Sequence, residues 1–296
     1  MKRVINYITL LLFVSVATAC LRDEILPCPP LQVNLAVKDK NYFNVDKVES
    51  EERVSEDLAF QAYVPTLYYR LCDVVTGELV EERGVFKAAG EGKTYPLTFP
   101  EELPHGTYVL TVWGGLDNLE GLSPDRGRMA FHPEQAEGND VYLVQDTLVY
   151  DAWNYEYTAE LERTKGKLVV EVNKLPVQSM QVRQEVTQLF GWVDALQFIY
   201  GGESQVTTAS HCTVDGPMVW KTLLAPSVRK KASVFGLQFF AAEEPETPLY
   251  IPDEVAVTME RNCLTVLRYV YDGKGAFTIY ILVNDNWELV HGMEID

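Results

Sequence analysis

The sequence has few histidines and few basic residues for its length. Four histidines are scattered among 296 residues, and none has a second histidine four residues away or a C-x-x-C pair nearby, so the patterns of zinc sites are missing. Lysine and arginine number 25 against 43 aspartates and glutamates, which gives a net charge of −18. This balance excludes nucleic-acid binding by phosphate neutralisation, which needs clustered lysine and arginine.

Motifs that carry catalysis are also missing. The sequence has no G-x-S-x-G elbow, phosphate-binding loop or dinucleotide fingerprint. His211 and Cys212 are adjacent, but neighbours on a strand point to opposite faces, which disfavours a nucleophile pair. The many carboxylates leave a glycosidase open by count alone, although no spacing singles out one pair. We therefore predict a protein without catalysis, cofactor, metal or small-molecule substrate.

After residue 20 the sequence has no apolar run long enough to span a bilayer. The chain begins with two basic residues, continues with an apolar stretch over 8–16 and reaches A-T-A just before Cys20. This pattern is typical of a lipoprotein signal, in which small residues fit the peptidase and the thiol accepts diacylglycerol. We predict a signal peptide over 1–19, lipid attachment at Cys20 and a spacer over 20–30. An uncleaved membrane anchor is the alternative, but spanning takes about 20 apolar residues.

The cysteine count allows two disulfides. Removing Cys20 leaves Cys28, Cys72, Cys212 and Cys263, an even number in a chain predicted to be exported. We expect Cys28 to pair with Cys72 and Cys212 with Cys263, because each bond then stays within one half of the chain. The alternative is free buried thiols, which behave as small apolar groups.

Alternation of apolar and polar residues predicts strands through most of the chain. In residues 31–37, Leu31, Val33, Leu35 and Val37 share one face of a half-buried strand. The Asp272-Gly273 pair predicts a tight hairpin turn. The charged segment 38–57 predicts a mobile, solvated loop. Apolar spacing in 179–190 predicts one short helix.

Short strands with regularly spaced turn residues predict an all-β chain of two β-sandwiches, with at most one or two short helices. Composition thins out at 151–157, so we place an N-terminal domain over 31–155 and a C-terminal domain over 156–296. The chain also has five tryptophans, which fill cores in one interpretation and form a stacking platform for sugars in another. They are Trp113, Trp153, Trp192, Trp220 and Trp287.

The order of several segments resembles a known family. After the cysteine of the signal come "RDEILPCPP", "LPHGTYVLTVWGGLDN", "ELERTKGKLVVEVNKLP" and, near the end, "YILVNDNWELV". Together they resemble the FimB-like fimbrial anchor and accessory proteins of Bacteroidales, subunits of type V pili. The resemblance implies two transthyretin-like Greek-key β-sandwiches, a lipid anchor in the outer membrane at the cell surface, and pilin subunits as partners. Such subunits join by strand addition, in which a strand from one fills a groove in the next.

The resemblance also implies a maturation site. Pilin-type relatives lose an N-terminal strand to a protease that cuts after a basic residue; here 31–37 corresponds to that strand and Arg53 to the site. An anchor has reason to stay uncut, since cutting would detach it from its lipid. Anchor, tip and other accessory subunits all remain open, and a surface glycan-binding lipoprotein of a polysaccharide-uptake system is the alternative function.

Substitution of Cys20 tests the predicted lipid anchor. Cys20→Ser removes the thiol that accepts the lipid, so the chain should remain an unprocessed or soluble precursor. Labelled palmitate should enter the wild-type protein and not this variant. Continued labelling of the variant would show that the lipid is attached elsewhere.

Overall fold

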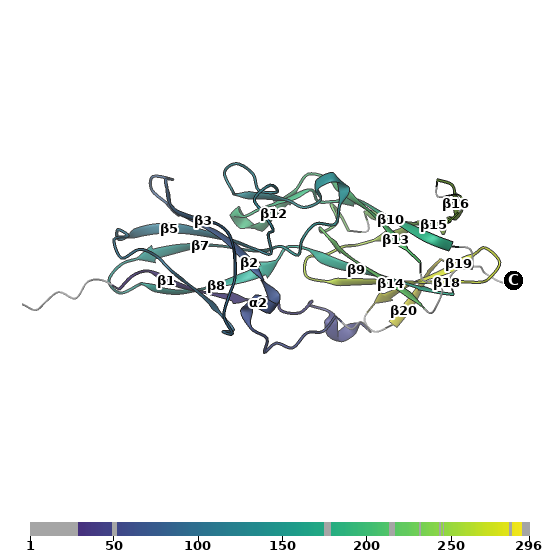
Figure 1. Ribbon diagram of the computed structural model, residues 1–296, viewed down its shortest axis with the longest axis horizontal. Helices are drawn as coiled ribbons and strands as arrows, with labels where there is room; N and C mark the ends of the chain where they lie inside the picture. The colour runs from purple at the N-terminus through teal and green to yellow at the C-terminus, as the bar shows by residue number, and fades with distance from the viewer. Residues whose placement is uncertain are drawn as a thin grey trace, which may run out of the picture.

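The computed structural model describes residues 29–48, 52–174, 179–212, 217–230, 232–242, 244, 246–283 and 286–291. Cys20, Cys28 and the predicted signal peptide therefore lie outside the described residues. Two β-sandwiches follow one another along the long axis of the molecule (Figure 1). The predicted all-β architecture is confirmed.

The first sandwich contains one seven-stranded sheet that folds into two layers. The order β3-β2-β5-β7 forms one layer and β8-β1-β4 the other, and β7 joins β8 at the pair Tyr142 and Arg163. β1 runs parallel to β8 and antiparallel to β4. The strands are β1 (Gln32–Val37), β2 (Thr66–Asp73), β3 (Leu79–Lys87), β4 (Tyr95–Thr98), β5 (Gly106–Gly114), β7 (Tyr142–Tyr150) and β8 (Glu156–Arg163).

The second sandwich is built from two five-stranded sheets. One has the order β13-β10-β15-β16 with β17 beside β15, and the other has the order β14-β9-β18-β19-β20. As in the first sandwich, one strand pair, β9 with β18, is parallel. The strands are β9 (Gly166–Asn173), β10 (Ser179–Leu189), β13 (Ser204–His211), β14 (Met218–Leu224), β15 (Ser233–Ala241), β16 (Pro248–Tyr250), β17 (Val255–Val257), β18 (Leu264–Tyr271), β19 (Phe277–Val283) and β20 (Asn286–His291).

A small third sheet bridges the two sandwiches. In it β6 (Arg128–Ala130), from the first half, pairs with β11 (Trp192–Asp194), which also pairs with β12 (Ile199–Gly201). Buried side chains continue across this junction, since Trp113 and Phe131 belong to the same apolar cluster as the core of the second sandwich. The helical elements are short: η1 (Val45–Lys47), α2 (Phe60–Tyr63), η2 (Pro133–Gln135) and η3 (Leu196–Phe198).

The structure places the change of sandwich after Arg163 and not after residue 155. β8 follows residue 155, yet it pairs with β1 from Glu156 to Leu161 and so belongs to the first sandwich. β9, which begins at Gly166, opens the second. The chain thus leaves one sandwich and enters the next through Thr164 and Lys165, and both of these residues are buried.

The helix predicted over 179–190 is wrong, because this segment forms β10. Val182, Val186 and Leu189 are all buried, at a spacing that imitates a helix. A β-bulge between Val186 and Leu189 produces this spacing: the register shifts there and Gln188 takes a positive φ of 58°. An extra residue in a bulge returns the next apolar side chain to the same face.

The hairpin predicted at Asp272-Gly273 is confirmed between β18 and β19. Gly273 has a φ of 81°, and the Asp272 carboxylate accepts hydrogen bonds from the backbone N–H of Lys274 and Ala276. Within the described residues, no helix has the length and apolar character needed to cross a membrane.

Gly166 offers a test of how tightly the start of β9 packs against the loop before β18 at the junction. A Cβ at this position would lie 2.2 Å from the carbonyl oxygen of Glu260 and 2.9 Å from that of Cys263. Because both obstacles are backbone atoms, Gly166→Ala should lower the free energy of unfolding by about 1–3 kcal/mol in urea melts. Gly84→Ala is the matched control, since nothing lies within 4 Å of its Cβ position; equal losses in the two variants would contradict the close junction.

Candidate functional site

β1 is an integral part of the first core. The side chains of Leu31, Val33 and Leu35 are fully buried and that of Val37 is 4% exposed, as the alternation in the sequence predicts. The strand is also closed at both ends by backbone hydrogen bonds, from Gln32 to Tyr155 and from Lys38 to Leu161. Full burial of an aliphatic side chain contributes roughly 1.5–3 kcal/mol. Removing β1 would therefore open an apolar groove between β4 and β8.

The segment after β1 crosses to the second sandwich (Figure 1). We call residues 38–48 and 52–57 the strap. Asn44 forms two hydrogen bonds of 2.8 Å with the backbone of Leu264, one through each atom of its amide, at the point where β18 begins. Tyr42 and Val45 are buried beside Leu264 in a small apolar cluster. The solvated loop predicted for 38–57 is thus wrong for Asp39, Tyr42 and Val45, which are buried, and agrees with the exposure of residues 53–57.

Asp39 anchors the start of the strap through charge. Its side chain is 2% exposed, and its carboxylate lies 2.6 Å from Arg261 and accepts the backbone N–H of Arg163 at 2.8 Å. Arg261 also pairs with Glu162, at 2.9 Å. Burial raises the pKa of the Asp39 carboxyl, and Arg261 opposes that rise. Removing one partner of such a buried pair costs about 3–5 kcal/mol.

Arg163 gathers a second set of contacts around the same point. Its guanidinium pairs with Asp140 at 3.0 Å, donates to Asn262 at 2.7 Å and to the hydroxyl of Tyr142, and lies 4.4 Å from the ring centre of Tyr42. Burial disfavours the charge, but Asp140, Tyr142 and Tyr42 together outweigh it and raise the pKa of Arg163. The strap, the first sandwich and the loop before β18 therefore meet around one cation.

The far end of the strap is tied to the second sandwich near Arg53. Glu52 pairs with Lys167 of β9 at 2.5 Å and with Lys221 of β14 at 2.8 Å. Burial raises the pKa of Glu52, yet the hydrogen bonds and charges of the two lysines outweigh burial and lower it. Arg53 itself is exposed and pairs with Asp46 of the strap.

The bond after Arg53 is held in a fixed conformation. The N–H of Val54 donates to the side-chain oxygen of Asn41 at 2.9 Å, and the side-chain nitrogen of Asn41 donates to the carbonyl of Val54 at 3.1 Å. The predicted protease site thus has an exposed side chain and a backbone that is hydrogen-bonded on one side and flanked by the Glu52 ion pairs on the other. A protease would have to open the strap locally before it could bind this bond.

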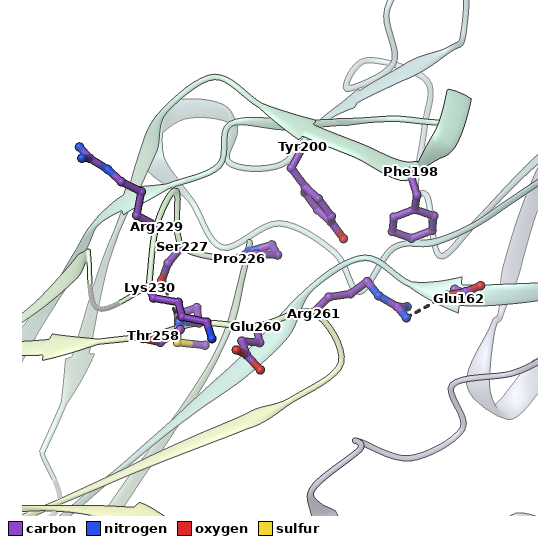
Figure 2. Close-up of a pocket in the computed structure, with 11 residues that line it drawn as sticks. Glu162, Phe198, Tyr200, Pro226, Ser227, Arg229, Lys230, Thr258, Glu260 and Arg261 are labelled. Atoms are coloured by element: carbon purple, nitrogen blue, oxygen red, sulfur yellow. Dashed lines mark hydrogen bonds and ion pairs between the residues drawn. The ribbon is translucent and has the colours of Figure 1, made fainter.

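A cavity of about 470 Å³ lies at the junction behind Arg261 (Figure 2). Tyr200 and Phe198 form one wall, and Arg229 and Lys230 lie at the other side. Its lining has three cationic and two acidic side chains, and Arg261 is already paired with Glu162. Among the described residues, no group of three metal-ligating side chains gathers.

No disulfide joins the three cysteines that the structure describes, Cys72, Cys212 and Cys263, to one another. Cys212 follows β13, at the end of the second sandwich remote from the junction, whereas the Cys263 carbonyl lies against Gly166 at the junction. A strand of seven residues separates the two ends by roughly 20 Å, which no disulfide spans. The expected bond between Cys212 and Cys263 is therefore absent from the structure. Cys28 lies outside the described residues, so its pairing with Cys72 stays a prediction.

The tryptophans do not form one stacking surface. Trp113 and Trp220 are buried. Trp192 and Trp287 are half-buried, each beneath an arginine at 3.8 Å, Arg128 and Arg268 respectively. Trp153 alone is open to solvent, 89% exposed. The five tryptophans therefore offer no shared platform in support of the glycan-binding alternative.

Sequence reasoning missed the polar side chains that fix the strap. Asp39 and Asn44 lie in a segment whose composition predicts solvation, and their partners, Arg261 and Leu264, lie more than 200 residues later. The local sequence indicated burial only at the apolar residues Tyr42 and Val45, which interrupt the polar run.

No family model and no curated protein matches the sequence, but its fold is shared with solved structures. A candidate adhesin from Bacteroides thetaiotaomicron superposes with a TM-score of 0.58 and 13% identity, covering 90% of this chain and 100% of that one. The fimbrial anchor protein Mfa2 from Porphyromonas gingivalis has a TM-score of 0.52 and 12% identity, and the match covers 89% of this chain and 100% of that one. A candidate polysaccharide-binding protein from B. thetaiotaomicron has a TM-score of 0.58 and 10% identity, covering 89% and 98%. The likeness confirms the fold that the resemblance implied.

His132 forms a hydrogen bond between the sandwiches that fixes its protonation state. Its Nδ1 lies 3.1 Å from the carbonyl of Ala136, while its Nε2 accepts the backbone N–H of Ala225 at 3.1 Å, so the ring is neutral. Burial lowers the pKa of His132 to about 3, and the charge of Lys165 acts in the same direction.

Stability should therefore fall when His132 is forced to accept a proton. Between about pH 6.5 and pH 3 the unfolded chain binds this proton and the folded chain does not, so acidification favours unfolding by up to about 1.4 kcal/mol per pH unit. In urea melts, the free energy of unfolding of wild type should exceed that of His132→Gln by less at pH 5 than at pH 8. An NMR titration of His132 with a midpoint near 6.5 would contradict the buried neutral ring.

Proposed function

We propose that this chain is a surface lipoprotein that serves as an anchor or accessory subunit of fimbriae. A lipid on Cys20 holds it in the outer membrane, and pilin subunits join it by strand addition, with no catalysis. Support comes from the fold, which the chain shares over most of its length with the fimbrial anchor protein of P. gingivalis. Among fimbrial roles, the way in which β1 and the strap are held favours the anchor.

The observation that carries the anchor role is the retention of β1. This strand lies directly after the predicted tether, and its four inward side chains complete the first core. A subunit that gave up β1 would lose both its lipid and the filling of its own groove. A subunit that keeps β1 stays on the membrane and offers its partner the outer edges of its sheets instead.

The strap supports the same role. Asp39, Asn44 and Glu52 each bind residues of the second sandwich or the junction, so release of the bond after Arg53 for cleavage would break several of these contacts together. In a matured pilin the corresponding segment has to be accessible to a protease. The folded strap therefore favours a subunit that remains uncut.

Substitution of Arg53 distinguishes an anchor from a matured pilin. In an anchor, Arg53→Ala should leave the length of the mature protein, its surface display and the attachment of fimbriae unchanged, because nothing is cut there. Gel mobility and mass spectrometry of the surface protein measure the length. Arg229→Ala is the control, since this arginine is also exposed but lies outside the strap.

A wild-type protein shorter than the Arg53→Ala variant would contradict the anchor role and point to a pilin. Loss of fimbriae in Arg53→Ala but not in Arg229→Ala, with the longer form accumulating, would do the same. A glycan-binding lipoprotein would show neither fimbrial attachment nor any assembly partner.

A further inference from the structure

The end of the first sandwich from which the predicted tether leaves presents exposed apolar side chains. We call this end the tethered pole; it consists of Pro29–Leu31 and of the loops 73–79, 100–105 and 151–155. The Tyr150 hydroxyl donates to the Pro29 carbonyl at 3.0 Å, and the N–H of Gln32 donates to the Tyr155 carbonyl at 2.8 Å, so the chain enters the sandwich beside the loop 151–155. The pole lies at the end of the molecule remote from the second sandwich (Figure 1).

The two most exposed large apolar side chains of the described residues both lie at this pole. Trp153 is 89% exposed and Val75 87%, whereas no other exceeds 62%. Val74 and Val149, also about half exposed, lie between them: Val74 bonds to Thr107, which pairs with Val149. At a strand spacing of about 4.8 Å, Val74 and Val149 lie on either side of Thr107 at the same end of the sheet as Val75 and Trp153.

Two loops of the same design hold Trp153 and Val75 outward. The carboxylate of Asp151 accepts the N–H of Trp153 at 2.7 Å, and the carboxylate of Asp73 accepts the N–H of Val75 at 2.8 Å. In each loop the aspartate turns inward to bind the backbone, and the apolar residue two positions later is left at the tip. Such side chain to backbone bonds fix a turn conformation, so the exposure is built into the loops.

We infer that the tethered pole docks on the lipid bilayer, with Trp153 and Val75 inserted at the interface. Tryptophan is favoured there because its ring is apolar and its N–H remains hydrogen-bonded. This inference rests on the lipid attachment in the proposed function. Eight residues lie between Cys20 and Pro29, and this stretch reaches at most about 30 Å. The tether thus holds this pole, and not the junction, near the membrane.

Fluorescence quenching by brominated lipids tests the docking. The acylated full-length protein is placed in vesicles of phosphatidylethanolamine and phosphatidylcholine, with bromine near the headgroup end of the acyl chains. Tryptophan fluorescence should fall relative to unbrominated vesicles, and Trp153→Phe should lose most of that fall. Trp287→Phe is the control, since Trp287 packs against Arg268 in the second sandwich.

A second pair of variants probes the pole without changing a tryptophan. Val75→Asp places a charge at the interface and should weaken the quenching of Trp153. Val219→Asp, on the 46% exposed position of β14, should leave it unchanged. Equal effects of the two variants would contradict docking through the pole.

The mass of the N-terminal peptide separates failure of the tether from failure of the docking. If the peptide carries acyl chains but the fluorescence is unquenched, or is quenched equally in Trp153→Phe, the docking is overturned while the lipid anchor stands. If the peptide carries no lipid, both the anchoring and this inference fail. Shielding of Trp153 only in assembled fimbriae, and not in vesicles, would assign the pole to a protein partner and overturn it as well.

Discussion

Asp39 and Arg163 carry charges into the place where the two sandwiches meet, and neither charge is stable there without partners from other segments. Asp39 forms an ion pair with Arg261, and Arg163 forms one with Asp140. These partners come from both halves of the chain, so satisfying the charges holds the strap against the second sandwich. β1 ends just before Asp39, and its position therefore depends on the same contacts.

This arrangement joins two properties that an anchor needs. The strand nearest the tether stays in the core because its apolar side chains have no better environment. The segment after it stays folded because opening it would leave buried charges and amides unpaired. In the proposed anchor, force applied to the second sandwich would pass to the lipid on Cys20 through the junction, β8 and β1.

The sequence predicts most of this fold and little of the junction. Alternation located β1, and the Asp272-Gly273 turn located a hairpin, because both signals are local. The helix predicted over 179–190 failed because a bulge mimics helical spacing. The solvated loop predicted over 38–57 failed at Asp39 and Asn44, because composition reports only solvation preferences. These two side chains bind partners far away in the chain, Arg261 and Leu264. Pairing across such distances leaves no pattern in a single sequence.

In the proposed function, the intact lipoprotein stands at the membrane end of a fimbrial assembly. The most direct measurement is cross-linking on cells, followed by isolation of the full-length protein from surface membranes and identification of its neighbours by mass spectrometry. The account predicts a pilin subunit as the cross-linked partner, together with uncut peptides that span Arg53. Recovery of polysaccharide-uptake proteins without any pilin, or of a chain that begins after Arg53, would contradict it.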